Sequence, residues 1–117
     1  MIETKAKDLG RLVGQSAEYQ AVKRANEALG QDAAAVALLK QMEQLRLDAQ
    51  QMIQRGERPT EQMEKDLDTL LGQVQSQMAY QRLVSAQENF DKLMARVNDW
   101  IVDGIEKGAT SSIITLG

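Results

Sequence analysis

The residues best suited to chemistry are three carboxylates in the middle of the chain. Glu61, Glu64 and Asp68 recur at steps of three and four residues, which places them on one side of an α-helix. Oxygen ligands in this arrangement suit Mg²⁺ or Ca²⁺, so a metal-dependent enzyme that uses this side is one hypothesis. Acidic residues near the start of a helix are also favoured by the helix dipole without any ligand, and we prefer this reading.

Other catalytic chemistry lacks its usual residues. The chain contains neither histidine nor cysteine, which removes the common general base at neutral pH, the common nucleophile pair, thiolate metal sites and iron–sulfur ligation. It also lacks a phosphate-binding glycine loop, an EF-hand loop and a Glu-x-x-His pair. We therefore expect a protein that is not an enzyme and that uses no cofactor or metal.

Apolar residues at helical spacing predict the elements that carry these side chains. The clearest helix follows Asp32, a candidate N-cap, and ends before Gly56 and Pro59, which stop a helix. Its inward positions are Ala35, Leu38, Met42, Leu45, Ala49 and Met52. The next helix begins after the cap residue Thr60, and its stripe is Met63, Leu67, Leu70 and Val74. The short loop between these helices predicts an antiparallel hairpin.

Two shorter helices are expected before the hairpin. Residues 2–13 predict a helix that ends near Gly14, and Ser16 can cap a second one that ends at Gly30. The two are either separate helices or one kinked element.

The final helix is predicted to be the longest. The apolar pattern weakens around residues 75–77 and resumes in a helix from about Met78 to Lys107, which spans about 45 Å at 1.5 Å per residue. Gly108 is expected to end it. Residues 109–117 are rich in β-branched and hydroxylated side chains and predict an extended C-terminal tail.

Together these elements predict an all-α fold. We expect an antiparallel bundle of about four to five helices, with a long helical hairpin and a long C-terminal helix, forming a single domain over residues 1–108. The final helix is expected to fold back beside the hairpin, where Phe90 and Trp100 would fill a shared interior.

The final helix carries an apolar face wider than one packing seam. A first stripe consists of Leu83, Ala86, Phe90, Leu93, Val97 and Trp100. Met94, Ile101 and Ile105 lie in a second stripe beside it. A face this wide suits contact with two neighbours, so we predict a homodimer in which these three residues form the interaction surface. The alternative is that the first two helices of the same chain bury the whole face.

Charge and hydropathy exclude some partners. The chain has 14 basic and 17 acidic side chains, a net charge of −3, and the basic residues are dispersed, which disfavours direct binding to nucleic acid. Its apolar runs are far below the ~18 residues that a membrane span requires. The N-terminus does not read as a secretory signal. We expect a cytoplasmic protein.

Three segments of the chain match a known pattern. They are SAEYQAVKRANEALGQDAAAVALLKQM from Ser16, the central GERPTEQ, and AYQRLVSAQENFDKLMARVNDWI from Ala79. In these segments the sequence, over about residues 5–107, resembles the YlbF/YmcA family of small bacterial helical proteins. The positions that carry the resemblance are Ser16, Glu18, Tyr19, Asp32, Gly56, Tyr80, Ala86, Phe90, Leu93 and Val97.

The resemblance implies an all-helical protein that associates with itself and with relatives. The better-known members form a cytoplasmic regulatory complex that affects competence, sporulation and biofilm formation and acts with an endoribonuclease that matures messenger RNA. Some members hold Fe–S clusters through cysteines near the C-terminus. This chain has no cysteine, so that cofactor does not carry over.

The resulting hypothesis is a non-enzymatic regulatory or adaptor protein that acts through contacts with other proteins, including regulatory relatives and an endoribonuclease complex. The alternative is a prefoldin-like holdase or a structural coiled-coil subunit, for which a hairpin of heptad helices would also serve. Suppression of client aggregation would favour the alternative, and a stoichiometric complex with a specific partner would favour the first.

Overall fold

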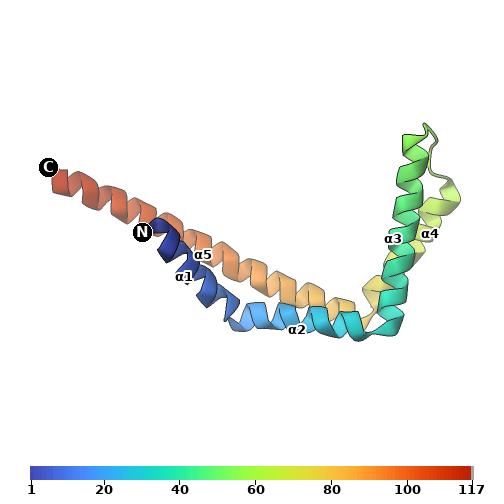
Figure 1. The fold of residues 1–117 in the computed structure, drawn as a ribbon, viewed down its shortest axis with the longest axis horizontal. Coiled ribbons are helices and arrows are strands. Elements are labelled where there is room, and N and C mark those ends of the chain that lie inside the picture. Colours follow the sequence, from blue (N-terminus) through green and yellow to red (C-terminus); the bar gives the residue numbers. More distant parts are fainter. Residues whose placement is uncertain (117) are drawn as a thin grey trace.

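The computed structural model describes residues 1–116, and the side chains of residues 1–109. Five α-helices follow one another in this range (Figure 1), and no strand occurs within it. They are α1 (Ile2–Gly14), α2 (Ala17–Gln31), α3 (Ala33–Gln54), α4 (Glu61–Ser76) and α5 (Met78–Leu116). The predicted all-α class, the number of helices and the long C-terminal helix are confirmed.

Short polar side chains begin three of these helices. Ser16, Asp32 and Thr60 each accept a hydrogen bond from the backbone N–H three residues further on, at 3.1, 3.0 and 3.1 Å. Such a bond satisfies an N–H group that has no partner inside the helix, and it is worth about 1 kcal/mol. All three predicted N-caps are confirmed, and α1 and α2 are separate helices.

Glycine ends α3 and allows the chain to reverse. Gly56 has a φ of +80°, in the left-handed region where a side chain is unfavourable. Its N–H donates to the carbonyl of Ile53 at 3.0 Å, and the N–H of Glu57 donates to that of Met52 at 2.8 Å. This pair of bonds is a Schellman motif, which satisfies the last carbonyls of the helix. α4 then returns beside α3, as the predicted hairpin requires (Figure 1).

The helices form two arms that diverge from a joint. α2 and α5 run side by side in one arm, and the α3–α4 hairpin forms the other (Figure 1). The chain crosses the joint twice, between α2 and α3 at Asp32 and between α4 and α5 at Gln77. Both residues have extended backbone angles (φ −85°, ψ 102° and φ −72°, ψ 127°), which interrupt the helices there. The prediction that the final helix folds back beside the hairpin is therefore wrong, because α5 packs mainly along α2. The molecule measures 69 × 36 × 21 Å and is elongated.

The core is thin. The buried apolar side chains among residues 1–109 are small: Val22, Ala35, Val74, Ala86 and Val97. Phe90 is half-buried and meets the Tyr19 ring edge-to-face, with 5.6 Å between ring centroids. Trp100 is 62% exposed, so the prediction that it fills a shared interior is wrong. The start of α2 lies beside residues 89–96 of α5, one turn short of Trp100.

The end of α5 also differs from the prediction. The helix passes Gly108 and continues to Leu116, so the predicted end near Lys107 and the extended form of residues 109–116 are wrong. Residue 117 lies outside the described residues. One glycine or β-branched residue costs a helix about 1 kcal/mol or less, whereas each added residue gains a backbone hydrogen bond. Without a capping motif, these residue types do not end the helix.

Candidate protein-interaction surface

The distal half of α5 carries large apolar side chains that face solvent. Met94, Ile101 and Ile105 are 41%, 46% and 63% exposed. Their spacing of seven and four residues places all three on one side of the helix, along about 16 Å at 1.5 Å per residue. The structure therefore brings the predicted interaction residues together on one surface, here called the α5 face.

Trp100 and Val102 extend the apolar character around the same part of α5, and both are exposed. A helix that is apolar on most sides is normally covered by something. The apolar pattern indicated Trp100 as a core residue. Trp100 is exposed because α2 begins beside residues 89–96 of α5 and does not reach it. The apolar pattern of α5 alone gives no information about the position of α2.

The first two helices of the chain cover only part of α5. Val97 is buried, whereas α1 has no buried residue of its own and leaves Ile2 and Leu12 exposed. The alternative in which α1 and α2 bury the whole apolar face therefore does not describe the region beyond Val97, where Ile101 and Ile105 remain exposed.

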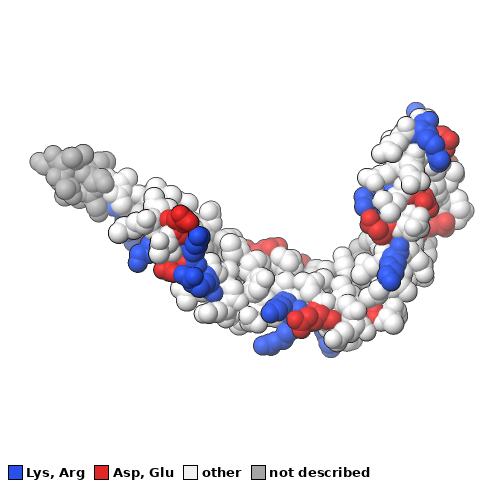
Figure 2. Space-filling view, viewed as in Figure 1, with Lys and Arg blue, Asp and Glu red and all other residues white. Residues whose placement is uncertain are grey.

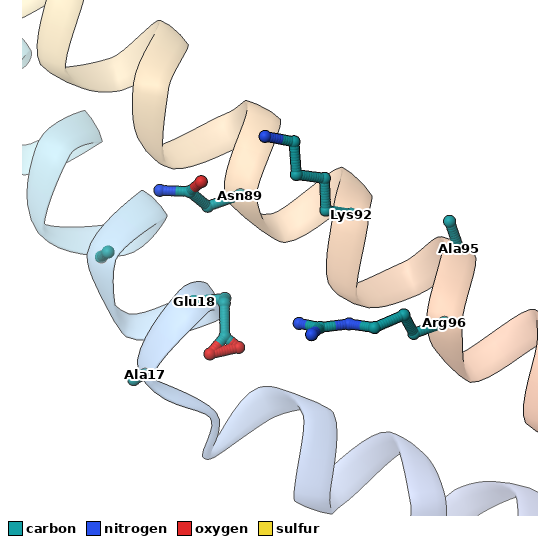
Figure 3. A pocket seen from close by; sticks show the side chains of 7 residues that line it. Ala17, Glu18, Asn89, Lys92, Ala95 and Arg96 are labelled. Carbon is teal, nitrogen blue, oxygen red and sulfur yellow. The ribbon is translucent and has the colours of Figure 1, made fainter.

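A shallow groove of about 730 Å³ lies between the start of α2 and the middle of α5 (Figure 3). Ala17, Ala21 and Ala95 contribute small side chains to it. Glu18 and Arg96 point toward one another across it (Figure 3). The recurrence of alanine in α2, four residues apart at Ala17 and Ala21, is a sequence signal that could have indicated this groove.

The three carboxylates of the metal hypothesis lie on the exposed surface of α4. Within the described part of the chain, no three Asp, Glu, His or Cys residues gather closely enough to hold a metal ion. Among the described side chains, neither Glu61 with Lys65 nor Glu88 with Lys92 forms an ion pair, although each pair is four residues apart on a helix. Asp103 and Lys107, at the same spacing on α5, form an ion pair at 2.9 Å.

One exposed pair on α3 shows perturbed titration. Arg46 donates hydrogen bonds of 2.6 and 3.1 Å to the Glu43 carboxylate. These bonds lower the pKa of Glu43 and raise the pKa of Arg46. Both side chains are more than half exposed, so water screens the pair and it adds little to stability.

Comparison with known proteins identifies the family. The family described as "Control of competence regulator ComK, YlbF/YmcA" matches residues 2–106. This chain belongs to the YlbF/YmcA family. The resemblance read from the sequence is confirmed, and the family description is regulatory rather than catalytic.

Curated relatives of this YlbF/YmcA chain cover most of its length. A "UPF0342 protein" of Limosilactobacillus reuteri is 28% identical over 101 residues, which are 86% of this chain and 82% of the relative. A "UPF0342 protein" of Leuconostoc mesenteroides is 24% identical over 94 residues, or 80% of each chain. These similarities span both arms of the structure.

The face of this YlbF/YmcA chain that Figure 2 shows has no single dominant charge. On the face shown in Figure 2, basic and acidic groups are interspersed along both arms. Among the helices that the structure describes, none has a stretch long and apolar enough to cross a membrane. The exposed apolar side chains of the distal half of α5 form the candidate interaction surface.

Proposed function

We propose that this chain is a non-enzymatic regulatory adaptor that acts by binding proteins through the α5 face. The single observation that carries the proposal is the exposure of Met94, Ile101 and Ile105 on a helix that its own neighbours leave uncovered. Membership of a regulatory family supports the same class of function.

The α5 face has the chemistry of a binding hot spot. Covering one large apolar side chain completely is worth about 1.5–3 kcal/mol, so covering the exposed halves of these three contributes about 1 kcal/mol each. The neighbouring Trp100 adds a residue type that is enriched at energetically dominant contacts. A short surface of this kind therefore supports a specific interface.

The proposed partners are proteins of related build. A second copy of the chain is the first, giving a homodimer, and other YlbF/YmcA regulators are the next. An endoribonuclease complex in the cytoplasm is the further partner that the family resemblance suggests. No cofactor, membrane or nucleic acid takes part in the proposed mechanism.

Charge placed on the α5 face tests self-association. Met94→Glu and Ile101→Glu should each shift the sedimenting mass toward the monomer while the far-UV helical signal stays unchanged, because both positions are exposed. Val84→Glu, at another exposed apolar position on α5, is the matched control and should leave the mass unchanged. An unchanged mass in both face variants would contradict self-association through the α5 face.

Binding to other proteins needs a separate measurement. The chain carrying an affinity tag should retain a stoichiometric complex from its native host, and the Ile101→Glu variant should lose it. Retention of the same partners at the same ratio by the variant would contradict a role for the α5 face.

A holdase is the second candidate, and the free end of the hairpin favours it. Ile53 is a large apolar residue exposed in the last turn of α3, where prefoldin-like proteins would present client-binding side chains. Light scattering from a heat-aggregating client protein tests this function. Suppression by the parent chain that is lost in Ile53→Ser would support it, and equal aggregation with and without the chain would dismiss it.

A further inference from the structure

A continuous trough runs along one flank of the α2–α5 pair. Two grooves between these helices share Ala21 and therefore join end to end. The trough is lined by small side chains, among them Ala17, Ala21, Ala25, Ala28, Ala79 and Ala86. Because these side chains are short, the backbone of another helix can approach the floor closely, as at other helix interfaces built on small residues.

The rim of this trough is positively charged. Its cationic residues are Arg24, Arg82, Lys92 and Arg96. None of the four forms an ion pair or a side-chain hydrogen bond among the described residues. Two acids also line the trough, Glu18 and Asp32, and they offset only half of the positive charge of the four cations. The trough therefore has a surplus of unpaired positive charge in a chain whose net charge is −3.

The complementary surface lies on α4 of the same chain. Glu61, Glu64 and Asp68 are exposed there without an ion pair in the described structure. Leu67 and Leu71 are 37% and 39% exposed, and helical spacing places them next to Glu64 and Asp68. This surface, here called the acidic face of α4, combines negative charge with apolar side chains that an alanine floor can cover.

The acidic face cannot fill the trough of its own molecule. The two arms diverge from the joint, and α4 meets α5 beside the turn at Gln77 rather than along the trough (Figure 1). The lengths nevertheless match, since the 16 residues of α4 span about 24 Å and the 15 residues of α2 span about 22 Å. Complementary surfaces on diverging arms of one chain suit a pair of molecules that exchange the contact.

We infer that the α2–α5 trough receives the acidic face of α4 from a second copy of this chain, reciprocally about a twofold axis. In such a pair each copy donates its hairpin and accepts that of its partner, so both contacts form at once. The opposite charges steer the encounter and fix its register, and salt weakens it. This contact uses residues other than Met94, Ile101 and Ile105, so it stands or falls separately from the α5 face.

A pair of charge-reversed variants tests the inference. The trough variant carries Arg82→Glu and Arg96→Glu, and the α4 variant carries Glu64→Lys and Asp68→Lys. Each variant alone places like charges on both surfaces, whereas their mixture restores attraction at both reciprocal contacts. Native mass spectrometry with one variant isotope-labelled measures the ratio of mixed dimers to self-paired dimers after exchange.

The expected result is a mixed dimer enriched at least about tenfold over random pairing, because close interfacial charge pairs are worth more than 1.4 kcal/mol. The control variant carries Lys23→Glu and Lys40→Glu, which reverse two exposed lysines outside the trough. It should pair with the α4 variant at random. Raising the salt concentration should reduce the enrichment. Random pairing of the first two variants, or a parent chain that never dimerises, would overturn the inference.

Two further outcomes keep this inference distinct from the α5 face. Enriched mixed dimers together with an Ile101→Glu variant of unchanged mass would remove the α5 face and retain the trough. Random pairing together with a monomeric Ile101→Glu variant would dismiss the trough contact and retain the α5 face. Should the first trough variant lose helicity, Arg24→Glu with Lys92→Glu reverses the same rim at two other positions and repeats the test.

Discussion

The two arms of the molecule are held together differently. The α2–α5 arm buries Val22, Ala86 and Val97 along its length and contains the edge-to-face contact of Tyr19 with Phe90. Among the described side chains, those buried in the hairpin are Ala35 and Val74, and both lie where α3 and α4 leave the joint. The outer part of the hairpin has only half-buried and exposed apolar side chains.

This difference in burial predicts that the two arms differ in stability. Helical stability in proteins comes mostly from packing of apolar faces, so the α2–α5 arm should form the stable part of the isolated molecule. The hairpin is defined by its local signals, the Thr60 cap and the Gly56 turn, and should open first. A partner that covers the hairpin should reduce the difference between the arms.

A charge buried in the α2–α5 arm should have the largest effect on stability. Val97→Asp places a carboxylate where Val97 is 6% exposed, in a core that buries no polar or charged side chain among the described residues. We expect the free energy of unfolding to fall by about 3 kcal/mol or more. Val102→Asp, at an exposed position on the same helix, is the control, and chemical denaturation of both variants measures the difference. Equal midpoints would show that Val97 is not part of a core.

Phe90 and Trp100 lie on the same helix but differ in burial, so their removal should destabilise the chain to different extents. Phe90→Ala should cost about 2–3 kcal/mol, because the ring is half-buried and loses its contact with Tyr19. Trp100→Ala should cost about 1 kcal/mol or less, because the side chain is mostly exposed. Thermal and urea unfolding of the two variants give the order. A larger loss for Trp100→Ala in the monomer would mean that this ring is covered.

Removing the helix cap at the joint and the cap near the hairpin tip should change hydrogen exchange in different parts of the chain. Asp32→Ala and Thr60→Ala each remove one hydrogen bond to a helix N-terminus and should each cost about 1 kcal/mol. Hydrogen exchange should speed up around the joint and in both arms for Asp32→Ala, and in the hairpin alone for Thr60→Ala. The same exchange pattern in both variants would contradict the separation of the two arms.

The turn at the hairpin tip should show a comparable cost of about 1 kcal/mol in Gly56→Ala, because alanine is disfavoured at a φ of +80°. Gly30→Ala is the control, since Gly30 is helical and a Cβ there meets no other atom. Thermal unfolding should show destabilisation in the first variant and not in the second. A loss in Gly30→Ala as large as that in Gly56→Ala would remove the special role of the turn.

The smallest expected effect concerns the exposed pair on α3. The Arg46 hydrogen bonds lower the pKa of Glu43, so the small stabilisation they provide is present near neutral pH and is lost as acid protonates Glu43. Glu43→Gln should therefore unfold at nearly the parent temperature at neutral pH and differ even less in acid. A clear loss at neutral pH would assign this pair a structural role in the hairpin.

Local features of the fold were predictable from the sequence, and the arrangement of the arms was not. The caps at Ser16, Asp32 and Thr60 and the turn at Gly56 depend on a few adjacent residues, and all formed as predicted. The divergence of the arms depends on the backbone angles at Asp32 and Gln77, and apolar periodicity does not predict these angles. The end of α5 was misplaced because glycine without a capping motif does not stop a helix.

The candidate surfaces divide in the same way. Met94, Ile101 and Ile105 follow from the stripe pattern of one helix, and the structure places them together and exposed. The trough forms only because α2 lies along α5. The sequence alone therefore does not predict that the alanines and cations of the two helices line one surface. The exposure of Trp100 likewise depends on where another helix begins.

Backbone hydrogen exchange over residues 94–105, measured at low and high protein concentration, tests most directly whether this molecule works through contacts between proteins. We expect this mode of action, so exchange in this segment should slow as the parent chain is concentrated and should stay unchanged in Ile101→Glu. Exchange rates in the parent chain that do not depend on concentration, with no added protein partner slowing them, would contradict it.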